Sequence, residues 1–103
     1  MQLRLGRMAR QELAHARAWY GRISPLLGRR FAAEVRAASA RIERNPLAYP
    51  LDLGDTRKCA LNVFPYTLHY AVRGNVLLVV AVSHQNREPD YWTDRLPEPD
   101  ADA

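Results

Sequence analysis

The hexapeptide ISPLLG, residues 23–28, divides the first half of the chain into two helical segments. Ser24 is a residue type that caps helix N-termini. Pro25 suits the first helical position, where its missing N–H costs no hydrogen bond. We therefore expect one helix to end just before Ser24 and a second to begin just after it. Two helices with so short a connection pack as an antiparallel hairpin.

Apolar side chains on both sides of this hexapeptide recur every three or four residues, which is typical of amphipathic helices. They are Ala9, Leu13, Ala16, Tyr20 and Ile23 before it, and Leu27, Phe31, Val35, Ala38 and Ile42 after it. The second helix is expected to end within RNPLAYP, residues 44–50, because Pro46 disfavours helical conformation at Asn45.

Beyond residue 50 the apolar period changes from about 3.6 to 2, which predicts strands. The alternating sets are Cys59, Leu61 and Val63, then Tyr66, Leu68, Tyr70 and Val72. Gly74–Asn75 fits a tight hairpin turn, and VLLVVAV, residues 76–82, is apolar on both faces like a central or doubly covered strand. We therefore expect an antiparallel sheet over about 57–83 and a short C-terminal helical segment within 89–96.

The fold class that follows is α+β, with a short N-terminal strand at residues 3–6 and the helical hairpin packed on one face of the sheet. The length of 103 residues suits one domain, placed at 1–96. The acidic, proline-containing tail PEPDADA, residues 97–103, is expected to be disordered. The single cysteine, Cys59, rules out an internal disulfide and is interpreted as a small core residue.

The chain has no apolar stretch approaching the roughly 20 residues of a membrane span, and its N-terminus has no apolar segment typical of signal peptides. We therefore expect a cytoplasmic protein without a membrane partner. Residues 1–96 hold 15 basic against 8 acidic residues, a net charge of +7, and 14 of the 15 are arginines. Such a domain suits nucleic acid or an acidic protein as partner. The alternative is that arginine only fills a solvated surface.

The main candidates for acid–base chemistry, phosphate binding and base stacking lie in AVSHQNREPDYWTDR, residues 81–95. His84 is a candidate acid or base, or a structural histidine at a strand end. Arg87 is a candidate phosphate ligand; the alternative is an ion pair with Glu88 or Asp90. Tyr91 and Trp92 are candidates to stack on a nucleic-acid base; the alternative is that they pack the C-terminal segment onto the sheet. No metal-ligand spacing, Gly-rich phosphate loop or nucleophile elbow is present, so we expect no metal and no cofactor.

The order of these elements resembles the RelE/ParE superfamily of type II toxin–antitoxin toxins. The resemblance is carried by AWYGRISPLLGRRF (18–31), NPLAYP (45–50), FPYTLHY (64–70) and AVSHQNREPDYWTDR (81–95). It implies the RelE/ParE-like fold, a small cytoplasmic bacterial toxin, plasmid stabilisation as the wider role, and a cognate antitoxin that neutralises the toxin. One branch of the superfamily, RelE-like, cleaves mRNA on the ribosome; the other, ParE-like, acts on DNA gyrase.

In the nuclease branch the resemblance implies a catalytic set of Lys58, His84, Arg87 and Tyr91. Metal-free RNA cleavage also needs cations around the phosphate in the transition state. This sequence has Ala60, Thr67 and Gln85 at positions where that branch is expected to carry further cations. We therefore favour a gyrase-directed, ParE-like toxin. A ribosome-dependent endoribonuclease and a degenerate, non-toxic member remain the alternatives, so whether the protein is an enzyme stays open.

Overall fold

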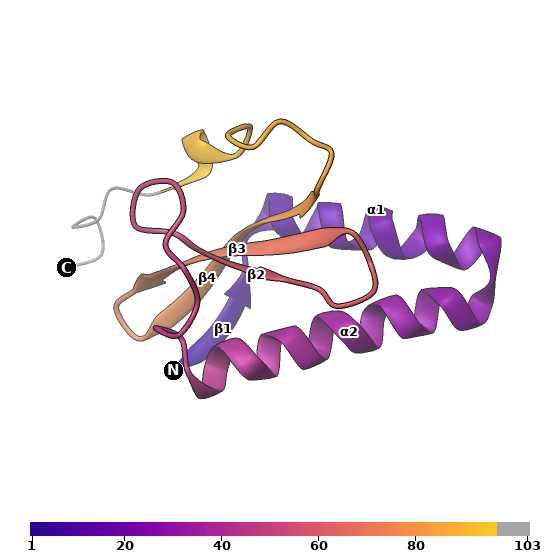
Figure 1. Cartoon of the computed structure of the whole chain (residues 1–103), viewed down its shortest axis with the longest axis horizontal. Helices are drawn as coiled ribbons and strands as arrows, with labels where there is room; N and C mark the ends of the chain where they lie inside the picture. Colours follow the sequence, from indigo (N-terminus) through magenta and orange to yellow (C-terminus); the bar gives the residue numbers. More distant parts are fainter. Residues whose placement is uncertain (97–103) are drawn as a thin grey trace.

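A computed structural model describes residues 1–96, so the predicted disordered tail, residues 97–103, lies outside the described part of the chain. Four strands and two long helices make up most of this part (Figure 1). In chain order the elements are β1 (Gln2–Leu5), α1 (Arg7–Ile23), α2 (Pro25–Arg44), β2 (Arg57–Ala60), β3 (Tyr66–Arg73), β4 (Val76–His84) and the 3₁₀ helix η1 (Thr93–Arg95). The predicted α+β class is confirmed.

The two helices form the predicted antiparallel hairpin, and their boundary lies at Ser24. The Ser24 Oγ accepts a hydrogen bond from the Leu27 N–H at 3.5 Å, and Pro25 occupies the first position of α2. The second helix ends before Pro46, with Asn45 as its C-terminal flanking residue. The hairpin is tight because Gly28 approaches Gly21: a Cβ added at Gly28 would lie 3.0 Å from the Gly21 Cα.

The sheet has the strand order β1-β4-β3-β2. Strands β2, β3 and β4 are antiparallel as predicted, and Gly74 at φ +59° makes the turn between β3 and β4. The sheet as a whole is mixed, because β1 pairs with β4 in parallel, Gln2 opposite Val76 and Leu5 opposite Val79. The apolar run of β4 is explained by its central position, with β1 on one side and β3 on the other.

A β-bulge between His69 and Tyr70 shifts the register of β3 and β4, since His69 pairs with Ala81 and Tyr70 with Val79. The extra residue, Val80, therefore lies with Ala81 on the side of the sheet away from the helices. The alternation resumes one residue out of phase, so that Val82 packs on the helical side.

The core has two parts, one on each face of the sheet. The larger packs α1 and α2 against the sheet around Phe31, Leu68 and Tyr70. The smaller lies where the C-terminal segment packs against the other face of the sheet (Figure 1). There Trp92 is fully buried against Val80 and Ala81. Trp92 thus packs on the sheet, which is one of the two interpretations of the Tyr91–Trp92 pair.

Two details of the β2 region refine the sequence interpretation. Cys59 is buried, as predicted for a small core residue. Val63, expected to continue the same alternation, is 69% exposed. The strand ends at Ala60, and the Asn62 and Val63 N–H groups both donate to the carboxylate of Glu34 on α2. A carboxylate-bound turn replaces the last residues of the expected strand.

Candidate functional site

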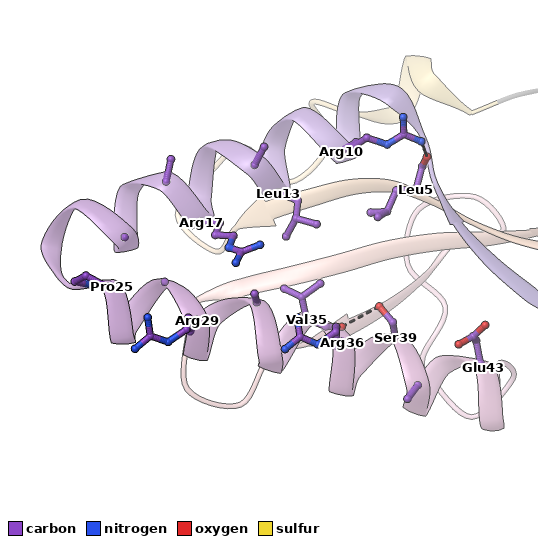
Figure 2. Close-up of a pocket in the computed structure, with 16 residues that line it drawn as sticks. Leu5, Arg10, Leu13, Arg17, Pro25, Arg29, Val35, Arg36, Ser39 and Glu43 are labelled. Carbon is purple, nitrogen blue, oxygen red and sulfur yellow. Dashed lines mark hydrogen bonds between the residues drawn. The ribbon is translucent and has the colours of Figure 1, made fainter.

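The first concave surface is a groove of about 880 Å³ between α1 and α2 (Figure 2). Its apolar lining includes Leu5, Leu13, Ala32 and Val35, and four arginines surround it: Arg10, Arg17, Arg29 and Arg36. The one acidic residue in the lining is Glu43, whose carboxylate accepts the Leu3 N–H at 3.2 Å. An apolar groove with a cationic border suits an amphipathic helix with acidic side chains.

The second concave surface is a polar cleft of about 400 Å³ beside the N-terminal half of α1. Three of the four predicted catalytic residues, His84, Arg87 and Tyr91, line it together with Glu12 and Arg95. Sequence reasoning brought these three together but missed Glu12 and Arg95. Glu12 has one sequence signal, since it is the only acidic residue among the first 33.

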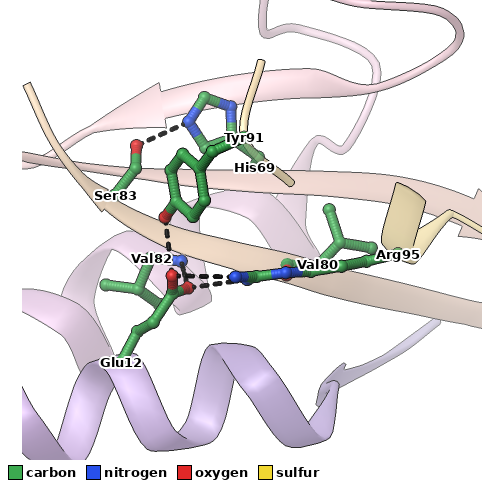
Figure 3. Close-up of polar contacts among 7 residues, drawn as sticks. All are labelled: Glu12, His69, Val80, Val82, Ser83, Tyr91 and Arg95. Carbon is green, nitrogen blue, oxygen red and sulfur yellow. Dashed lines mark hydrogen bonds and ion pairs between the residues drawn. The ribbon is translucent and has the colours of Figure 1, made fainter. Parts of the chain in front are cut away.

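The carboxylate of Glu12 organises the cleft (Figure 3). It accepts two hydrogen bonds from the Arg95 guanidinium, at 3.0 and 3.2 Å, and one from the Tyr91 hydroxyl at 2.7 Å. The Val82 N–H donates to the same carboxylate at 3.0 Å. Glu12 and Arg95 side chains are each only 16% exposed, so the ion pair is largely withdrawn from water.

This network exists because β1 is shorter than β4. The Gly6 N–H donates to the Val79 carbonyl, and beyond that point β1 no longer accompanies β4. Two backbone groups of β4 follow on this open edge. The Val80 carbonyl accepts a hydrogen bond from Arg95 Nη1 at 3.1 Å, and the Val82 N–H donates one to the Glu12 carboxylate. The Glu12–Arg95 pair therefore satisfies backbone groups that a longer β1 would otherwise pair.

The cleft shifts the pKa values of its two central acids in opposite directions. Burial alone would raise the pKa of Glu12, but the hydrogen bonds from Arg95, Tyr91 and Val82 hold it below the ordinary value. Burial and the hydrogen bond to the Glu12 carboxylate raise the pKa of the Tyr91 hydroxyl well above its ordinary value. Tyr91 therefore keeps its proton, donates a hydrogen bond to the Glu12 carboxylate and is poorly suited to act as a general base.

The other two residues of the cleft differ in how they are held. His84 Nδ1 accepts the Asn86 N–H at 3.0 Å, which leaves Nε2 as the protonated nitrogen of the neutral ring. The Arg87 guanidinium lies 3.8 Å from the centre of the Tyr91 ring. Within residues 1–96 Arg87 forms no ion pair with Glu88 or Asp90, so cation–π stacking takes the place of the ion pair that sequence reasoning allowed.

Lys58, the fourth predicted catalytic residue, does not line this cleft. It lies on β2 opposite His69, and β2 is separated from β4 by β3, a distance of roughly 9–10 Å at ordinary strand spacing. Ala60 and Thr67 lie opposite each other on the same two strands and contribute no charge. The structure thus does not bring the four residues of the nuclease set into one site.

The family comparison agrees with the architecture around these two concave surfaces. The family model described as "ParE toxin of type II toxin-antitoxin system, parDE" matches residues 3–89. The chain belongs to this ParE toxin family. Comparison with curated proteins gives no match.

One solved structure similar to this ParE-family chain belongs to the "Chromosomal ParDE TA system from P. aeruginosa". The similarity has a TM-score of 0.56 and covers 82% of this chain and 95% of that chain, at 18% sequence identity. At this identity the likeness supports the fold. Tyr91 and Arg95 lie beyond residue 89, so two of the three partners of Glu12 fall outside the matched segment.

A buried polar group of this ParE-family protein lies under Trp92, on the sheet face away from the helices. His69 stacks on the Trp92 ring at 4.7 Å, and its Nε2 lies 2.8 Å from the Ser83 Oγ. The Asp52 Oδ2 lies 3.5 Å from the His69 Nδ1. The residue types are those of a hydrolase triad, but Trp92 covers His69, so the group is structural.

The described residues 1–96 hold neither a cluster of metal-ligand side chains nor a helix that could span a membrane. In that range no three His, Cys, Asp or Glu side chains come together as a possible metal site. Neither α1 nor α2 is apolar enough over sufficient length to cross a membrane.

Proposed function

We propose that this ParE-family toxin inhibits bacterial growth by acting on DNA gyrase in the cytoplasm, and that a cognate antitoxin neutralises it by binding the groove between α1 and α2. The observation that carries the choice of target is the separation of Lys58 from the cleft that holds His84, Arg87 and Tyr91. An RNase without assembled cations lacks the main stabilisation of its transition state. A target-binding inhibitor needs no such cluster.

The groove supports the antitoxin part of the proposal. Its apolar floor is formed by side chains of β1, α1 and α2, among them Leu5, Leu13 and Val35, and its border is cationic. An antitoxin segment that forms an amphipathic helix with acidic flanks would bury its apolar face there and pair with Arg17 and Arg29. The complex would then leave the opposite side of α1 uncovered.

A second candidate function is ribosome-dependent mRNA cleavage. The observation that favours it is the common cleft of His84, Arg87 and Tyr91, which places the imidazole near an arginine that has no acidic partner among residues 1–96. In this alternative His84 acts as the acid or base, Arg87 binds the phosphate, and Lys58 and Tyr91 act as further catalytic residues.

The deciding experiment compares purified toxin in two assays, gyrase supercoiling and cleavage of ribosome-bound mRNA. The variants are His84→Gln and Arg87→Gln, with Arg30→Gln as the control, since Arg30 is exposed on α2 and lines neither concave surface. Inhibition of supercoiling by wild-type toxin without mRNA cleavage supports gyrase. Cleavage that both variants lose by about 100-fold or more, while the control keeps it, supports the nuclease. Inactivity in both assays by folded, antitoxin-binding protein indicates the degenerate alternative.

A further inference from the structure

The outer side of α1, away from the groove, exposes large apolar side chains. Met8 is 42% exposed, Trp19 54% and Ile23 63%. Together with His15 they stand at helical spacings of seven, four and four, which places them along one side of the helix. None of them lines the groove between α1 and α2. We name Met8, His15, Trp19, Arg22 and Ile23 the outer α1 surface.

The outer α1 surface also carries an arginine next to an aromatic ring. The Arg22 guanidinium lies 5.6 Å from the centre of the Trp19 ring, a cation–π contact that holds both side chains at the surface. Residues 13–33 contain four arginines and no acidic residue. Glu12, the nearest acid before that stretch on α1, is already paired with Arg95 and Tyr91. The surface therefore combines exposed apolar area with uncompensated positive charge.

The side chains favour an acidic protein surface over other partners. A second copy of the chain would bring like charges together, which costs affinity. Nucleic acid would use the arginines and Trp19, but Met8 and Ile23 offer a phosphate backbone no hydrogen bond. Trp, Arg and Met are enriched at the cores of protein interfaces, and Trp and Arg dominate their energetic hot spots.

We propose that the outer α1 surface is the contact with the toxin's protein target, separate from the groove that takes the antitoxin. This inference rests on the proposed function, in which the target is DNA gyrase. Trp19 and Ile23 insert into an apolar depression of an acidic region of gyrase, and Arg22 pairs with a carboxylate at its border. Antitoxin and target then occupy different sides of α1.

The test uses the full-length double variant Trp19→Ser/Ile23→Ser. A matched control, Leu26→Ser/Leu47→Ser, removes equally exposed apolar side chains on other elements. Toxin variants are titrated into a gyrase supercoiling assay, and antitoxin binding is measured by calorimetry on the same preparations. We expect the surface variant to need at least about tenfold more protein for half-inhibition, with antitoxin affinity unchanged. The control should behave like wild type in both assays.

Each other outcome overturns a distinct statement. A surface variant that inhibits gyrase as well as wild type overturns this inference and leaves the proposed function intact. A variant that loses antitoxin affinity as well assigns the surface to the antitoxin instead. If wild-type toxin leaves gyrase unaffected, the proposed function fails, and the assignment of this surface to gyrase fails with it.

Discussion

The carboxylate of Glu12 on α1 and the guanidinium of Arg95 on η1 form a two-point ion pair across 83 positions of the sequence. The pair closes the open edge of β4 and positions Tyr91, on which Arg87 stacks. The cleft therefore depends on one acidic side chain that sequence reasoning did not single out.

Replacement of that acid should be costly. In Glu12→Gln the Arg95 charge keeps its largely buried position without a carboxylate, and the Val82 N–H keeps only an amide oxygen. We expect a loss of about 3 kcal/mol in the free energy of unfolding, measured by urea denaturation. Glu88→Gln, the same substitution at an exposed glutamate, should change it by less than about 0.5 kcal/mol. Equal stabilities of the two variants would contradict the structural role of Glu12.

The buried His69 predicts a pH dependence of stability. Burial lowers the pKa of His69 below its ordinary value of 6.5, with Lys58 adding to the effect and Asp52 and Glu12 opposing it. As pH falls, the unfolded chain therefore takes up this proton before the folded protein does. The stabilisation is complete above about pH 6.5 and is lost as pH falls through the lower folded-state value.

The measurement is urea denaturation of wild type, His69→Gln and His15→Gln between about pH 5 and about pH 8, a range above the ordinary Glu pKa of 4.5. Stability should decline with falling pH in wild type and in His15→Gln, whose histidine is exposed. The decline should be smaller in His69→Gln. The same slope in all three proteins would show that His69 does not cause it.

The two tryptophans form a natural matched pair, one fully buried and one 54% exposed. Trp92→Ala should destabilise the protein by roughly 3–5 kcal/mol, since it opens a cavity over Val80 and Ala81. Trp19→Ala should cost less than about 0.5 kcal/mol. Thermal unfolding followed by circular dichroism distinguishes them. A small effect of Trp92→Ala would mean that the C-terminal segment contributes little to the fold.

The two glycines of the helical hairpin should respond in opposite directions to alanine. A Cβ at Gly28 meets the Gly21 backbone at 3.0–3.2 Å, whereas a Cβ at Gly21 meets nothing within 4 Å. Alanine improves helix propensity at both positions by about 1 kcal/mol. Gly21→Ala should therefore stabilise by up to about 1 kcal/mol, while Gly28→Ala should destabilise by roughly 1–2 kcal/mol. Denaturation midpoints of both variants that rise together would refute the close helix approach.

The groove prediction concerns antitoxin affinity. Arg17→Glu/Arg29→Glu reverses two charges in the lining, and Arg30→Glu/Arg44→Glu makes the same charge change outside it. We expect the first variant to bind the cognate antitoxin at least about tenfold more weakly in calorimetry at moderate salt, and the second to stay within about threefold. Equal losses would mean that net charge, and not the groove, determines binding.

Local patterns predicted the parts of the fold that depend on neighbouring residues. Helical spacing and the Ser24–Pro25 pair located the hairpin, and period-two alternation located β3. The direction of β1 could not be predicted, because four residues with one alternating pair of leucines fit a parallel or an antiparallel partner. The bulge was also hidden, since Val80 and Ala81 are both apolar and suit either face.

The candidate site was predictable only in part, for a related reason. His84, Arg87 and Tyr91 lie close in sequence, so they could be grouped before their geometry was known. Lys58 was grouped with them by resemblance alone, and the strand order separates it. The contact of Glu12 with Tyr91 spans 79 positions and leaves no periodic signal in the sequence.

The parallel pairing of β1 with β4 has a consequence for how the toxin is made. Gln2 has its strand partner at Val76, so 74 positions of sequence separate the two residues. Pairing of such distant segments is slow and must wait for the later one. A nascent chain therefore keeps β1 unpaired until β4 has been synthesised, and translation that stops before β4 yields a fragment whose first strand has no partner.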